Sequence, residues 1–88
     1  MVQTIIVQII IDENNNAYEI GNRVRIKMKP HNADKPEWTS EYIGYIDDIK
    51  EDVIDIATAV GVRHLSVERI DKIRLAAEDE SFDNQWDF

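Results

Sequence analysis

The chain has 88 residues, enough for one small domain, and its hydrophobic content of 43% is enough for one core. It contains no cysteine, which excludes disulfide bonds and thiolate metal sites and is typical of a reducing cytoplasm. Its net charge of −8 disfavours nonspecific binding to nucleic acid, because phosphate contacts need a positive field.

The acidic excess is concentrated at the end of the chain. Residues 1–77 carry 10 basic and 13 acidic residues, whereas residues 78–88 carry five acidic residues and no basic one. The composition of the last segment is typical of a disordered chain. We therefore expect one folded domain over 1–77, followed by a flexible acidic-aromatic tail over 78–88.

The N-terminal segment is rich in β-branched residues, with TIIVQIII at 4–11, and predicts a strand over 3–11. This apolar stretch has no signal-peptide pattern and is too short to span a bilayer, which favours a soluble, cytoplasmic protein without membrane contact. The following residues, DENNNA at 12–17, predict a turn. The strand over 3–11 is a candidate for pairing with an open sheet edge or with a second copy in a homodimer.

Residues 23–29, RVRIKMK, alternate strictly and predict a half-buried strand after a turn at Gly21. One face carries four basic side chains, which we call the basic ridge: Arg23, Arg25, Lys27 and Lys29. Their spacing of about 6.6–6.8 Å is close to the phosphate spacing of an extended single strand. Cross-strand pairing with Asp47, Asp55 or Asp71 is the alternative, and the acidic surroundings favour it.

The stretch YIGYIDDIKEDVIDIATAV, beginning at Tyr42, fits either a helix or two bent strands. A helix would place Gly44 and several β-branched residues in its interior, which is unfavourable. We therefore predict strands over 42–49 and 53–58 joined at 50–52. Ile46 and Ile49 depart from period two, so we also expect a β-bulge or sharp bend between them.

The rest of the chain continues the β pattern. A turn is expected near Gly61, then a strand over 62–66, one 3₁₀ turn over 67–70 and a last strand over 71–76. Five or six short strands with turns every 8–12 residues predict an all-β domain built as a small antiparallel barrel or sandwich.

Three segments, YEIGNRVRI, YIGYIDDIKEDVIDI and HLSVERIDKIRL, together resemble the small SH3-like β-barrels, including KOW-type and Sm-like domains. The likeness covers about residues 18–76 and consists of glycine and apolar spacing. It implies an SH3-like barrel fold with one 3₁₀ turn. Such barrels serve many functions, so no activity is implied. The glycine-rich KOW turn and an Sm-type RNA-binding signature are not evident.

Catalytic and metal-binding patterns are not found. Asp12, Asn14 and Asn16 begin like a calcium loop, but Ala17 and Arg23 stand where Gly and a bidentate Glu are needed. The two histidines lie 33 positions apart, without zinc spacing. Adjacent acids such as those at 47–48 point to opposite faces of a strand and cannot readily act as an acid/base pair. We therefore expect no cofactor and no enzymatic activity.

Two segments carry candidate partner-binding residues. The loop 30–40 holds His31, Pro36 and Trp38, and a loop aromatic beside restricted backbone is a frequent contact residue. The tail supplies a mixture of aromatic and acidic side chains: Phe82, Asp83, Trp86, Asp87 and Phe88. A fold-back of Trp38 onto the barrel, or of the tail onto the basic ridge, would explain the same residues without a partner.

Three functional hypotheses follow. The first is a non-catalytic protein-binding module or inhibitor that contacts a basic partner, such as a nucleic-acid enzyme, through its acidic surface, the loop 30–40 and the tail. The second is binding of single-stranded RNA or DNA by the basic ridge, with the tail autoinhibitory. The third is a self-assembling structural subunit that pairs through 3–11.

Overall fold

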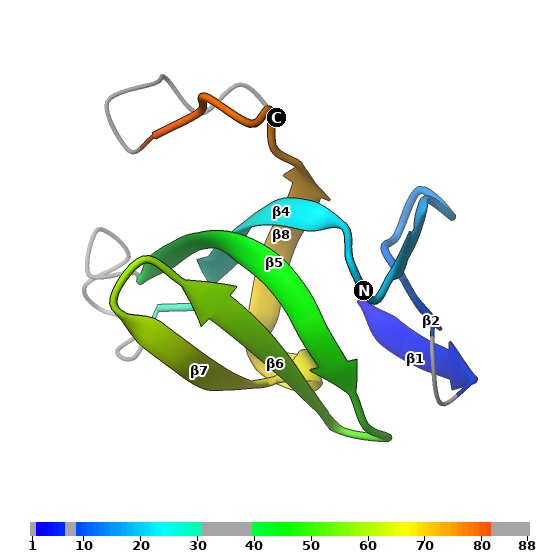
Figure 1. The fold of residues 1–88 in the computed structure, drawn as a ribbon. Helices are drawn as coiled ribbons and strands as arrows, with labels where there is room; N and C mark the ends of the chain where they lie inside the picture. Colours follow the sequence, from blue (N-terminus) through cyan, green and yellow to red (C-terminus); the bar gives the residue numbers. More distant parts are fainter. Residues whose placement is uncertain (1, 7–8, 31–39, 82–88) are drawn as a thin grey trace.

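A computed structural model describes residues 2–6, 9–30 and 40–81. These residues form an all-β fold with a single 3₁₀ turn (Figure 1). The elements are β1 Gln3–Ile6, β2 Ile9–Ile11, β3 Ala17–Glu19, β4 Arg23–Met28, β5 Glu41–Ile49, β6 Val53–Thr58, β7 Gly61–Ser66, η1 Val67–Arg69 and β8 Ile70–Leu75.

The predicted strand over 3–11 is in fact two strands, so that prediction is corrected. β1 and β2 pair with each other in antiparallel fashion, with an irregular register between Thr4 and Ile6. β2 then pairs with β3, a strand that the sequence analysis did not anticipate. The result is a small three-stranded sheet of order β1-β2-β3. β1 is an edge strand of this sheet, and an edge strand can pair with another strand. Pairing of β1 with a second copy of the chain stays a prediction.

The predicted turn after β2 is built around one carboxylate. Asp12 Oδ1 accepts the backbone N–H groups of Asn14 at 2.9 Å and Asn16 at 3.0 Å. Asn15 takes a positive φ of 65°, which asparagine tolerates better than most residues. The polar side chains that began like a calcium loop therefore close a hairpin turn.

The larger sheet has five antiparallel strands in the order β7-β6-β5-β4-β8. The predicted strands 42–49 and 53–58 are confirmed, and the register shifts between Ile46 and Asp48 as the expected bulge requires. This bulge lets both Ile46 and Ile49 reach the interior, where each is 1% exposed. Gly44 permits close strand approach, because a Cβ there would lie 2.4 Å from the Ala57 carbonyl oxygen.

The core lies inside the curve of this sheet and is almost entirely aliphatic. Its largest fully buried side chains are Val24, Ile10, Ile26, Ile46, Ile49, Ile54, Ile56 and Ile73. Burial of an isoleucine contributes about 1.5–3 kcal/mol, so these residues dominate the stability of the domain.

Tyr18 joins the small sheet to the large one. Its hydroxyl donates toward Asp12 Oδ2 at 2.9 Å and the Ile73 carbonyl oxygen at 3.1 Å. Burial, together with the neighbouring Asp12 carboxylate, raises the pKa of Tyr18. The phenol therefore stays protonated and bridges β3 to β8.

The five strands curve around a common interior, and η1 leads from β7 to β8 (Figure 1). The predicted 3₁₀ turn and the last strand are confirmed within one residue at each boundary. β7 and β8 are the two ends of the sheet order, and no backbone ladder joins them within the described ranges. Closure into a barrel therefore stays a prediction.

A candidate binding groove on the outer face of the sheet

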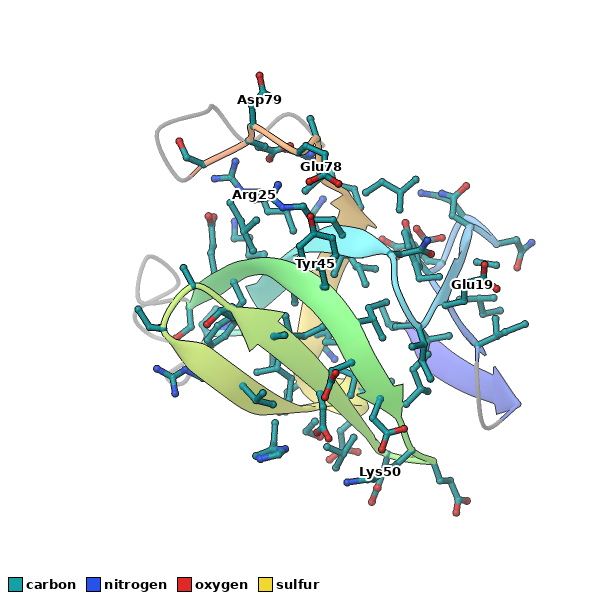
Figure 2. The ribbon with its side chains drawn as sticks, viewed as in Figure 1. Glu19, Arg25, Tyr45, Lys50, Glu78 and Asp79 are labelled. Carbon is teal, nitrogen blue, oxygen red and sulfur yellow. The ribbon has the colours of Figure 1, made fainter. Side chains whose placement is uncertain are left out.

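The chain leaves β8 and returns across the sheet as a short segment, residues 76–81, which we call the strap. Its start is fixed by the backbone, since the Ala76 N–H donates to the Arg23 carbonyl oxygen at 2.9 Å. The Arg23 guanidinium then donates to the carbonyl oxygens of Ala77 and, at 3.1 Å, Glu80. Figure 2 shows the Arg25 side chain rising from β4 toward this strap.

Glu80 anchors the strap through two arginines. Arg74 donates from Nη1 to Oε1 at 2.9 Å and from Nη2 to Oε2 at 2.6 Å, a bidentate arrangement. Arg25 Nη1 also donates to Oε2, at 3.1 Å. Hydrogen bonds from Arg74, and then from Arg25, outweigh the effect of burial and lower the pKa of Glu80 to about 2. The carboxylate is thus ionised at neutral pH and buried at 7% side-chain exposure.

The basic ridge is not a continuous exposed stripe, which corrects that interpretation. The side chain of Arg25 is only 3% exposed, and its ion-pair partners are Glu80 and Glu41, the latter at 3.0 Å. Neither of these two partners is among the candidate cross-strand partners of the basic ridge, Asp47, Asp55 and Asp71. At the far end, Lys29 donates from Nζ to the Glu68 carbonyl oxygen at 3.0 Å. Lys27 is half-buried.

This arrangement also revises the boundary of the tail. Glu80 was expected in a disordered segment beginning at residue 78, but it is buried and paired with the sheet. Within the described residues, Glu80 is thus folded back onto Arg23 and Arg25 of the basic ridge. The other candidate tail residues, Phe82, Asp83, Trp86, Asp87 and Phe88, lie outside the described residues, as do His31, Pro36 and Trp38.

Between the strap and the sheet lies an open groove of about 660 Å³. One wall comes from β5 and the other from the β6–β7 hairpin, with the strap at one end. The lining residues are Arg23, Glu41, Tyr42, Ile43, Gly44, Tyr45, Ala57, Thr58, Ala59, Val60, Arg63, Glu80 and Ser81. The groove therefore combines an apolar wall with a few charged groups at its margins, as ligand sites generally do.

Two apolar side chains of the groove are open to solvent. Tyr45 is 41% exposed on β5, and Val60 is 77% exposed in the hairpin turn. The Tyr45 hydroxyl donates to Glu78 Oε2 at 2.5 Å, and this hydrogen bond raises the pKa of the phenol. Figure 2 shows Tyr45 directed toward Glu78 on the strap. The strap thus holds the aromatic ring in place at the mouth of the groove.

Arg63 gives the groove an available positive charge. It lies on the exposed strand β7 and forms no ion pair with any described residue. Arg23, at the opposite margin, uses its side chain to hold strap carbonyls. Positive charge therefore stands on both sides of the apolar wall.

A second buried carboxylate lies outside the groove. Asp55 is 7% exposed and contacts His64 Nδ1 at 2.6 Å and Lys50 Nζ at 3.6 Å. The hydrogen bond with His64 lowers the pKa of Asp55. His64 is itself 69% exposed at its side chain. Within the described ranges, no cluster of three or more His, Cys, Asp or Glu side chains is arranged to hold a metal ion.

Apart from Arg23, which belongs to the basic ridge, the groove residues were not singled out as site residues by the sequence analysis. The available signal was Tyr45, an aromatic residue next to Gly44. In a strand its side chain points to the face opposite to that of the core-facing Ile46. Alternation gives the direction of such a side chain, but it does not reveal that a hairpin and a strap rise on either side of it. Glu80 belongs to a run of three acidic residues, and nothing in the sequence indicates which of the three is buried.

Comparison of the chain with models of known protein families, with curated proteins and with solved structures found no match. The resemblance to SH3-like barrels therefore stays a prediction, and the candidate function depends on the groove itself. No helix in the described part of the chain has the length and apolar character needed to cross a membrane.

Proposed function

We propose that this protein is a non-catalytic protein-binding module and that the groove beside β5 receives an extended segment of a partner protein. The observation that carries the proposal is the combination of a 660 Å³ groove with two exposed apolar side chains, Tyr45 and Val60. A cavity of this size can accept one or two large side chains, since small-molecule pockets span about 300–1,000 Å³.

The chemistry of the groove indicates which segment would bind. Tyr45, Ile43 and Val60 offer apolar contact, which favours an aromatic or branched side chain in the ligand. Arg63 and Arg23 stand at the margins, whereas Glu80 and Glu41 are neutralised by arginines. A ligand with an aromatic side chain beside a carboxylate therefore fits better than a basic one.

We expect the interaction to be weak or transient. Stable protein interfaces bury roughly 1,200–2,000 Å², which is more than one groove on an 88-residue domain is expected to supply. The contact with a basic partner expected from the loop 30–40 and the tail would add to this area. That second contact stays a proposal, because its residues lie outside the described ones.

A peptide-display selection against the immobilised full chain tests the proposal. We expect enrichment of short peptides with an aromatic residue next to an acidic one. Val60→Glu should abolish their binding by placing a negative charge in the groove, whereas Val62→Glu should not. Val62 is the matched control, because it lies on the same hairpin, is 46% exposed and is not among the lining residues.

Two results would contradict the proposal. One is the absence of any enriched peptide from a library that yields binders for a control domain. The other is enrichment of peptides that bind Val60→Glu and Val62→Glu equally well, since these would bind elsewhere on the surface.

Nucleic-acid binding is a second candidate, and one specific observation favours it. The Glu80 carboxylate is held by Arg74 and Arg25 as a phosphate group would be held. If Glu80 is an autoinhibitory phosphate mimic, Glu80→Ala should bind a labelled oligothymidylate or oligouridylate more tightly than wild type, with steep salt dependence. Equal and negligible binding by both proteins at low salt would remove this candidate. The deep burial of Arg25, which Glu41 also pairs, favours the protein-binding proposal over this one.

A further inference from the structure

A second, smaller cavity lies where β4 and β7 end and β5 begins, beside η1. Its volume is about 210 Å³. It is separate from the groove, because Tyr42 is the only described residue that lines both. Pockets for whole small molecules span about 300–1,000 Å³, so this cavity has room for one chemical group of a ligand.

Two basic residues that line this cavity, Lys29 and Arg69, are fixed next to each other. The Lys29 N–H donates to the Arg69 carbonyl oxygen at 2.8 Å, and Lys29 Nζ donates to the Glu68 carbonyl oxygen at 3.0 Å. Arg69 Nη2 donates to the carbonyl oxygens of Pro30 at 3.0 Å and Lys29 at 3.4 Å. All of these acceptors are neutral carbonyl groups, so the two positive charges are held in place without being neutralised.

Neither cation has a carboxylate partner among the described residues. The chain has 18 acidic and 10 basic residues, and sheets commonly pair such charges across neighbouring strands. His64 also lines the cavity, but its Nδ1 contacts the Asp55 carboxylate at 2.6 Å, so its charge is balanced there when the ring is protonated. Two adjacent cations repel each other, and a bound anion would remove this repulsion.

The remaining lining adds hydroxyl groups and an apolar wall. Ser66 occupies the N-cap position of η1, yet its hydroxyl forms no capping hydrogen bond. The Ser40 hydroxyl forms no hydrogen bond with a described residue. Met28, Tyr42 and Leu65 supply the apolar part. The cavity therefore offers two cations and two hydroxyl donors beside a surface that an organic group can contact.

We infer that this cavity, lined by Lys29, Arg69, Ser40 and Ser66, binds a phosphate group. A phosphate monoester carries a charge of about −1.5 to −2 at neutral pH and presents three terminal oxygens, which matches two cations and two hydroxyl donors. Arginine binds phosphate in bidentate fashion, and Arg69 Nη1 and Nε form no hydrogen bond with any described residue. A single carboxylate would leave about one positive charge unbalanced. The apolar wall favours an organic ester over free phosphate.

NMR titration of the ¹⁵N-labelled full chain tests this inference. The probes are inorganic phosphate, phenyl phosphate and acetate, at constant ionic strength and about pH 8, where both phosphates are mainly dianions. We expect saturable shifts of the Leu65 and Ser66 amides with a Kd of about 1–10 mM for phosphate, because exposed cations are screened by water. Phenyl phosphate should bind more tightly, and acetate at least about fivefold more weakly. Equal affinity for both phosphates would support the site and assign it to free phosphate.

Variants locate the binding. Lys29→Gln and Arg69→Gln should each weaken phosphate binding about five- to tenfold. Lys72→Gln is the matched control, because Lys72 is an exposed lysine on β8 that does not line the cavity, and its Kd should stay within about twofold of wild type. Arg69 also holds backbone carbonyl groups, so Lys29→Gln decides the matter if Arg69→Gln disturbs the amide spectrum elsewhere.

Three results would overturn the inference. The first is a set of phosphate-induced shifts that do not saturate. The second is equal affinity of Lys29→Gln and Lys72→Gln for phosphate, which would place the anion elsewhere. The third is binding of acetate as tight as that of phosphate, which would show that the cavity does not select a dianion.

Discussion

The two faces of the five-stranded sheet are held by different forces. The inner face packs aliphatic side chains, with Ile46, Ile54 and Ile56 at 1% exposure or less. The outer face is covered in part by a six-residue strap whose main anchor is an ion-pair network around Glu80. Hydrophobic burial does not depend on pH, whereas a carboxylate anchor does. We therefore expect the strap to open while the core stays folded.

The largest expected effect is on the inner face. Ile54→Asp would bury an unpaired charge at a site with 0% exposure, at a cost of several kcal/mol against a total stability of about 5–15 kcal/mol. We expect this variant to be unfolded by circular dichroism. Val53→Asp, at the adjacent half-buried position, should remain folded. The reverse pattern would contradict the strand register of β6.

A smaller effect is expected when the strap anchor is neutralised. Glu80→Gln keeps the size of the side chain but removes the charge that pairs with Arg74 and Arg25. Weakening a buried, charge-assisted contact should cost about 1–3 kcal/mol, measured as a lower urea midpoint. Asp79→Asn, on an exposed neighbour, should change stability by less than about 0.5 kcal/mol. Equal midpoints for both variants would mean that Glu80 does not anchor the strap.

Acid should release the strap in the wild-type protein. The pKa of Glu80 in the folded state is about 2, below its ordinary value of 4.5. The ionised carboxylate therefore stabilises the closed strap above pH 4.5, and this contribution is lost as the pH falls through about 2. The Ser81 amide resonance, followed by NMR between pH 6 and 2, should shift accordingly. Glu80→Gln should lack this transition, and its persistence there would assign it to another group.

The smallest effect is expected at Asp55. Asp55→Asn removes the charge that faces His64 and Lys50 but can retain a hydrogen bond. Both partners are largely exposed, so the loss should be below about 1 kcal/mol and should shrink with added salt. Thermal unfolding at low and high salt measures it. A loss of several kcal/mol, unchanged by salt, would show that the exposure of His64 and Lys50 does not screen their contacts with Asp55.

Most of the large sheet could be predicted because its signals are local. The β-branched runs, the glycine at position 44 and the break in alternation at Ile46–Ile49 each constrain the backbone within a few residues. The short strand β3 was missed because Ala17–Glu19 contains only one strongly apolar side chain, Tyr18. The division of 3–11 was missed because the run TIIVQIII contains no Gly, Pro, Asn or Asp to indicate a turn.

The site could not be predicted to the same extent, because its contacts join distant parts of the chain. Arg25 and Glu80 are 55 positions apart, and nothing local distinguishes Glu80 from Glu78. Alternation correctly placed Arg25 on the outer face of β4 but could not show that an acidic strap would bury it. The charge pattern along β4 predicts which way its side chains point. The strap that covers them comes from a distant part of the sequence.

The central claim, that the strap opens independently of the core, is tested most directly by native-state hydrogen exchange of the full chain at increasing urea. The N–H groups of Ala76 and Glu80 report the strap, and those of Ile54 and Ile56 report β6. We predict a lower, nearly urea-independent opening free energy for the strap and a higher, steeply urea-dependent one for β6. A single opening free energy with one urea slope for all four amides would contradict the account.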